Sequence, residues 1–274
     1  SADSTEAALD GCRARGRLVA RDGFYLLPGR ERLGELRQAR AERAREIWPR
    51  ALAFAALLSR LPFVRMVAVT GSLAWDNVSD HADADFMIVT EPGRVWLVRW
   101  LAAALRRSLM STGLKLCANY VLSERTLALS DRDVYVACEL VGMRVVSGVE
   151  TYRRMRRVNG WARAYFPNAE EPRVAPARDA SGPGGTALAA AVAEIAALAE
   201  PVLRTRVGNW LKRSEMAYRM RKYDRTIPVD ERQDDRFGPD TFKCHLPQYR
   251  QRALVAFEAR LAALGLPAAA PPRR

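Results

Sequence analysis

Two apolar segments separated by a short polar loop constrain the fold most. Residues Val64–Thr70 form a run rich in Val and other apolar residues that stops at Gly71, which is typical of a buried strand ending at a turn. A second apolar run, from Ala84 to Thr90, opens with the pattern Asp83-x-Asp85. We therefore expect two neighbouring strands, with the loop between them returning the chain from the first to the second.

The segments that follow predict how this pair of strands is extended. An amphipathic helix is expected from Trp96 to Met110, and a third strand from Leu114 to Leu122. Strand, loop, strand, helix and strand in so short a stretch predict an α/β (α+β) fold, with a small mixed sheet flanked by helices.

The N-terminal part is expected to contain a helix, a hairpin and a second, longer helix. A short helix should end at Gly16, and Asp22-Gly23 is the turn of a hairpin within Arg17 to Leu27. Helix followed by ribbon is similar to the last part of a winged helix-turn-helix, and we expect a remnant or packing module rather than a DNA reader. The long helix should run from Arg32 to Leu58, kinked or split at Pro49.

The C-terminal half is expected to be helical. The pattern is helical from about Asp133 to Phe166, and Pro167 to Gly185 resembles a linker or surface loop. Three more helices are expected, namely Thr186 to Ala199, Val202 to Lys222 beyond Pro201, and about Pro247 to Leu264. The resulting domain prediction is a winged-helix-like remnant (1–30), a catalytic domain (31–145) and a helical C-terminal domain (146–274).

The Asp-x-Asp pattern is the feature of the sequence that most directly predicts a chemical function. Side chains two apart on a strand point the same way, so Asp83 and Asp85 should project together beside the Gly-Ser turn. Two such carboxylates repel and raise each other's pKa unless a cation lies between them, and oxygen ligands suit Mg²⁺ or Mn²⁺. Gly71 lets the backbone approach an anion, and Ser72 can hold one. These parts would position a nucleoside triphosphate and its metals for in-line attack at phosphorus.

This arrangement resembles the DNA polymerase beta-type nucleotidyltransferase superfamily, over about Val64 to Leu122. Gly71 and Ser72 match the first element of its signature, and Asp83, eleven positions after Ser72, and Asp85 match the second. The resemblance implies transfer of a nucleoside monophosphate from a triphosphate such as ATP to an acceptor hydroxyl. It implies metal binding by Asp83 and Asp85, and phosphate binding by Gly71 and Ser72.

The third expected strand departs from the superfamily pattern. Relatives usually carry a third carboxylate there, whereas the polar residue inside this strand is Asn119. An Asn oxygen can ligate a metal, but it brings no charge and is a poor base. Either the enzyme works with two carboxylates, helped by Glu124 or Glu139, or the protein is a catalytically impaired nucleotide- or nucleic-acid-binding module. A partner protein of a toxin–antitoxin or defence pair is a third interpretation.

The charge balance does not choose between these interpretations. The chain has 44 basic and 31 acidic residues, a net charge of +13, which favours polyanionic partners such as nucleic acid. However, most basic residues are Arg, as a GC-rich genome tends to encode. A basic cluster (Arg153, Arg154, Arg156 and Arg157) could neutralise phosphates or form a solvated helix face. The segment from Val202 to Lys222, with Trp210 and Tyr218, could stack on bases, but we favour a buried stripe.

Several function classes are excluded or disfavoured by composition. No apolar run reaches the roughly 18 residues that span a bilayer, so we expect no membrane partner. Residues 1–10 are polar and acidic, unlike a signal peptide. The four cysteines lie far apart without a CxxC pair, which argues against a zinc or disulfide scaffold and predicts a cytoplasmic protein. His81, in the loop before Asp83, is either a substrate contact or a solvated residue.

Overall fold

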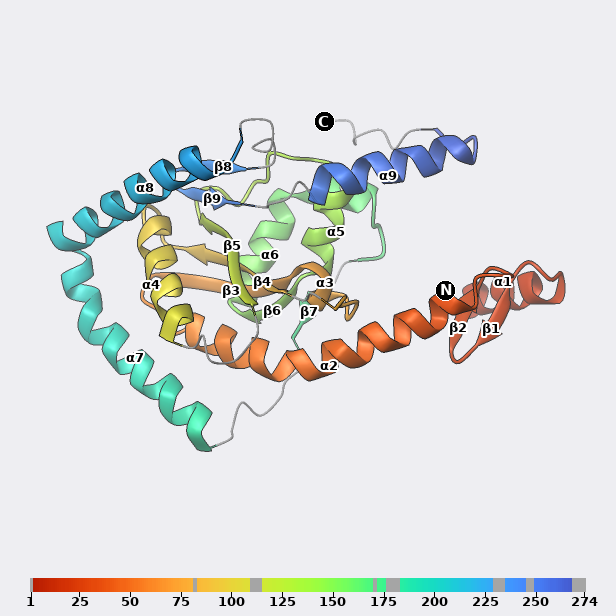
Figure 1. Ribbon diagram of the computed structural model, residues 1–274, viewed down its shortest axis with the longest axis horizontal. Helices are drawn as coiled ribbons and strands as arrows, with labels where there is room; N and C mark the ends of the chain where they lie inside the picture. Colours follow the sequence, from red (N-terminus) through yellow and green to blue (C-terminus); the bar gives the residue numbers. More distant parts are fainter. Residues whose placement is uncertain are drawn as a thin grey trace.

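The protein is built around one mixed β-sheet with helices on both faces, which confirms the expected α+β class (Figure 1). The computed structural model describes residues 2–80, 83–108, 115–169, 172–175, 183–228, 235–244 and 249–267. Within them, seven strands lie in the order β7-β6-β3-β4-β5-β9-β8. Their bounds are β3 Val64–Thr70, β4 Asp83–Thr90, β5 Lys115–Ser123, β6 Arg144–Ser147, β7 Arg173–Val174, β8 Arg236–Gly238 and β9 Thr241–Lys243.

The three strands expected from the sequence form the centre of this sheet. β3 is antiparallel to β4, and β4 is parallel to β5. A parallel pair needs a crossover, which α4 (Val95–Ser108) supplies. Trp96 and Leu97 at its start are fully buried, as the amphipathic pattern predicts. Met110 and Leu114, the expected end of the helix and start of the strand, lie outside the described residues.

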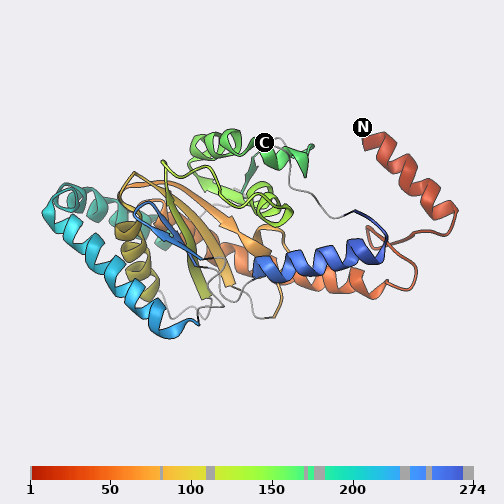
Figure 2. The same cartoon turned by 90° about the horizontal axis from the view of Figure 1, so that it is seen from above.

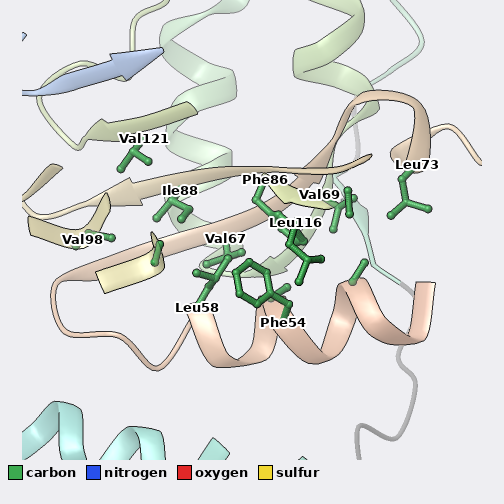
Figure 3. Packing of buried hydrophobic residues seen from close by; sticks show 14 of the residues in the cluster. Phe54, Leu58, Val67, Val69, Leu73, Phe86, Ile88, Val98, Leu116 and Val121 are labelled. Atoms are coloured by element: carbon green, nitrogen blue, oxygen red, sulfur yellow. The ribbon is translucent and has the colours of Figure 1, made fainter. Parts of the chain in front are cut away.

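The alternation of β4 divides the hydrophobic core between the two faces of the sheet. Phe86 and Ile88 belong to the cluster that also contains residues of α2 (Arg32–Leu58) and α4. Figure 3 shows Phe54 and Leu58 of α2 on this side, beside Phe86. Met87 and Val89 belong to the second cluster, with residues of α5 (Val134–Gly142) and α6 (Val149–Val158). Asp83 and Asp85 have the same parity as Met87, so β4 directs them toward the α5 side.

Proline does not divide the helices where the sequence suggests it should. α2 runs unbroken through Pro49, whose neighbours Trp48 and Ala51 are buried. α7 (Pro183–Leu203) continues through Pro201, so the expected division there is wrong. Instead, the break comes at Thr205, whose hydroxyl accepts a hydrogen bond from the Val207 amide and caps α8 (Arg206–Thr226). Packing against the rest of the protein offsets the one backbone hydrogen bond that a proline removes.

The C-terminal half supplies strands as well as helices. β6 interrupts the continuous helix expected to Phe166 because Met143 is extended and Gly148, at φ +75°, turns the chain into α6. A Cβ on Gly148 would lie 2.0 Å from the Arg65 carbonyl oxygen, so only glycine fits there. The short 3-10 helix η2 (Gly160–Ala164) follows α6. The expected boundary between residues 145 and 146 falls inside β6, and the β8–β9 hairpin extends the sheet beside β5.

The two ends of the chain lie outside the sheet. α1 (Ala2–Ala14) precedes the hairpin of β1 (Val19–Arg21) and β2 (Phe24–Leu26), with Asp22-Gly23 at its turn as predicted. Figures 1 and 2 both place this unit at one end of the molecule, with α7 and α8 at the other. α9 (Tyr249–Ala263) has no buried residue, and its first turn is tied to α5 by the ion pair between Arg250 and Asp133.

Candidate functional site

The turn between β3 and the short helix α3 (Gly71–Ala74) is shaped by Gly71. Its φ of +65° is left-handed, and a Cβ there would lie 2.8 Å from Oδ2 of Asp85. The register of the antiparallel pair explains this proximity, because Thr70 lies directly opposite Asp85. Ser72, the next residue, is exposed. The structure therefore places the Gly-Ser turn and the Asp-x-Asp pattern side by side.

Asp83 and Asp85 lie on one face of β4, on either side of the buried Ala84. Burial and the charges of Asp83 and Glu139 together raise the pKa of Asp85 to about 7, while a hydrogen bond from Asn119 opposes them. Oδ1 of Asp83 is buried and accepts no hydrogen bond from the described residues, and the Lys115 ammonium lies 3.8 Å from it. This pair is thus a crowded anionic site with an unused carboxylate oxygen.

Asn119 reaches the site through an irregularity in β5. Asp85 pairs with Cys117 and Met87 with Tyr120, so β5 has one more residue than β4 over this stretch, as in a bulge. The Asn119 amide nitrogen donates a short hydrogen bond to Oδ1 of Asp85. Asn119 therefore orients Asp85 and favours its charged form.

Of the two glutamates expected to help, only Glu139 lies at the site. The Gly71 amide donates to Oε2 of Glu139 at 3.2 Å, and burial raises the pKa of this glutamate. Glu124 instead follows the far end of β5, where its carboxylate is 3.1 Å from Arg154. Within α5, Glu139 lies six residues after Asp133, whose carboxylate caps the helix by accepting from the Val136 amide at 2.9 Å.

The loop after α3 is anchored to α2 by contacts that the sequence did not reveal. Arg37 donates to the carbonyl of Asp76 at 2.5 Å, and Arg43 donates to that of Val78 at 3.0 Å. The Trp48 indole donates to the Asp76 carboxylate at 2.7 Å, which fixes this left-handed residue (φ +50°). The spacing of basic residues, three apart along α2, is the sequence signal that could have predicted these contacts. Asp76 is therefore part of the scaffold that leads to Asp83.

A pocket opens next to the carboxylates on the α5 side of the sheet. Thr70, Met87 and Tyr120 of the sheet line it, together with Glu139, Lys243 and Arg250. Burial would raise the pKa of Asp131 in this pocket, but Lys243 and Arg250 outweigh burial and lower it. The pocket thus combines apolar and charged lining residues, and through Thr70 and Glu139 it adjoins the crowded carboxylates.

The basic and aromatic segments noted in the sequence lie elsewhere. Arg153 and Arg157 pair with Glu150 on α6, at the solvent-exposed surface. Trp210 and Tyr218 on α8 are 61% and 51% exposed, so the favoured interpretation of a buried stripe is wrong for them. His81 lies outside the described residues.

Comparison of the chain with protein-family models, with curated proteins and with solved structures gives no match. Among the described residues, no group of three or more His, Cys, Asp or Glu side chains is arranged to hold a metal ion. None of the described helices combines the length and apolarity needed to cross a membrane.

Proposed function

We propose that this protein is a metal-dependent nucleotidyltransferase of the DNA polymerase beta type, which moves a nucleoside monophosphate from a nucleoside triphosphate to an acceptor hydroxyl. The observation that carries the proposal is the position of Asp83 and Asp85 on one face of β4, in contact with the left-handed turn at Gly71. A strand end, a close backbone turn and paired carboxylates are the parts that phosphoryl transfer requires.

The residues present fit a divalent cation such as Mg²⁺ or Mn²⁺. The charges of Asp83 and Asp85 oppose each other, and Oδ1 of Asp83 has no donor among the described residues, so a cation between them would relieve both problems. Mg²⁺ commonly uses only one or two protein carboxylates and completes its shell with water and substrate phosphates. When bound, the cation would offset negative charge on the transferring phosphoryl group.

The remaining side chains support this arrangement. Asn119 orients Asp85 through its hydrogen bond, and Glu139 holds the turn by accepting from the Gly71 amide. Because that amide is already engaged, we assign phosphate binding at the turn mainly to the exposed Ser72, through its hydroxyl and amide. We place the activity in the cytoplasm, since all four cysteines are free thiols.

The test supplies α-labelled nucleoside triphosphates with Mg²⁺ and measures both the label that is transferred and the unlabelled pyrophosphate that is released. Asp83→Ala and Asp85→Ala should each nearly abolish turnover. Asp80→Ala is the matched control, because Asp80 is an exposed aspartate of the same loop, paired with Arg43. Turnover that is unchanged in both Asp83→Ala and Asp85→Ala would overturn the catalytic assignment.

A nucleotide- or nucleic-acid-binding protein without catalysis is the second candidate. The observation that favours it is the neutral amide of Asn119 in the position of a third carboxylate. A thermal-shift panel of the four nucleoside triphosphates, with and without Mg²⁺, separates the two candidates. A shift that needs both nucleotide and metal supports the transferase, and a metal-independent, salt-sensitive shift supports the binding protein.

A further inference from the structure

A second hollow lies on the opposite face of the sheet from the carboxylates. It is enclosed by β5, α4, α8 and β9, has a volume of about 230 Å³, and is called here the arginine hollow. Its lining includes Arg99, Arg106, Arg219, Cys117, Asn119 and Phe242. Among the described residues that line it there is no carboxylate.

Three arginines line the arginine hollow, and two of them share one carboxylate. Arg99 and Arg219 both donate to the same oxygen of Glu215, at 2.9 and 2.8 Å. Burial and the neighbouring charge of Arg219 together lower the pKa of Arg99 to about 10, although Glu215 opposes them. Its Nε is buried without an acceptor among the described residues. One carboxylate thus serves two guanidinium groups, and Arg106 adds a third, exposed one.

Because two guanidinium groups share one carboxylate oxygen, donors remain in the hollow for a bound anion. Guanidinium groups present paired donors that match phosphate oxygens, and a cluster of them suits a doubly charged group. The volume of the hollow, about 230 Å³, is below the roughly 300–1,000 Å³ of sites for drug-sized ligands. Phe54, Leu116 and Phe242 also line it, so part of the ligand can be apolar.

We propose that the arginine hollow binds the phosphoryl group of a small phosphorylated molecule, at a site separate from the carboxylates. The proposal is independent of nucleotidyl transfer, because it uses residues on the other face of the sheet and no metal. Asn119 is the link between the two sites, since it lines the hollow and also donates to Asp85.

The test is isothermal titration calorimetry of the full chain with inorganic phosphate and with pyrophosphate, in EDTA and low chloride. Arg106→Ala should weaken binding about tenfold or more, as expected for loss of one charge-assisted contact. Arg107→Ala is the matched control, because Arg107 is the next exposed residue of α4 and does not line the hollow. It should change binding less than about twofold, as expected for a screened surface charge.

Further variants and ligands separate this proposal from its competitors. Asp83→Ala should bind phosphate like the wild type, so failure of the proposed transferase would leave this result standing. A single-stranded oligonucleotide and acetate are titrated as competing ligands, because the first carries the phosphates of nucleic acid and the second carries a carboxylate. Absence of phosphate and pyrophosphate binding, equal losses in Arg106→Ala and Arg107→Ala, or preference for the oligonucleotide or acetate would each overturn the proposal.

Discussion

Replacement of Asp85 by Asn should stabilise the protein near neutral pH in the absence of metal. Burial, Asp83 and Glu139 together raise the pKa of Asp85 from 3.8 to about 7, so its charged form is disfavoured in the folded protein. Asn has nearly the same shape, carries no charge, and its oxygen can still accept from the Asn119 amide. The substitution therefore removes an unfavourable charge and keeps the neighbouring contact.

The size and sign of the effect follow from the pKa difference. A folded-state pKa above the unfolded one means that the folded protein binds the proton more tightly, so the wild type loses stability as pH rises from about 4 to about 7. A difference of about three pKa units corresponds to a ceiling of about 4 kcal/mol. Because part of the shift comes from neighbouring charges that solvent and ions screen, we expect about 2 kcal/mol at pH 8 and almost none at pH 4.

Urea denaturation of wild type and Asp85→Asn between pH 4 and pH 8 measures this difference directly. Asp80→Asn is the control, because its side chain is 79% exposed and it lies in the loop that precedes β4. Millimolar Mg²⁺ should stabilise the wild type and so reduce the difference in free energy of unfolding between the two proteins. A difference that does not vary with pH, or an Asp85→Asn protein that is less stable at pH 8, would refute the reasoning.

Two further substitutions test the scaffold. Gly71→Ala should lower the free energy of unfolding by about 1–3 kcal/mol, because the residue is left-handed and its Cβ would meet Asp85. Urea denaturation measures this loss. The thermal shift that needs both nucleotide and metal should also be absent in this variant. Asn159→Ala should lower it by about 2–4 kcal/mol, because this buried amide donates to the carbonyls of Leu127 and Met155. A change below about 0.5 kcal/mol in either variant would contradict the role given to that residue.

Local patterns were enough to predict the centre of the fold. The bounds of β3 and α2 agree with the sequence because long apolar runs and helical periodicity carry strong local signals. The shared face of Asp83 and Asp85 follows from strand geometry alone. By contrast, β6 and each strand of the β8–β9 hairpin are only three or four residues long. Their pairing with distant strands has no local signature in the sequence. A short strand next to a strong helix former is therefore easily taken for helix.

Local sequence patterns could not decide whether Glu124 or Glu139 lies beside the carboxylates. β5 runs parallel to β4, so a residue that follows β5 must lie at the opposite end of the sheet from Asp83. Glu139 instead reaches the site from α5, which packs against the sheet, by accepting a hydrogen bond from the Gly71 amide. With Glu139 buried beside Asp85, another carboxylate at position 119 would add a further repulsion to a site whose pKa is already raised. An amide that donates to Asp85 relieves that repulsion, which gives a physical reason for Asn at this position.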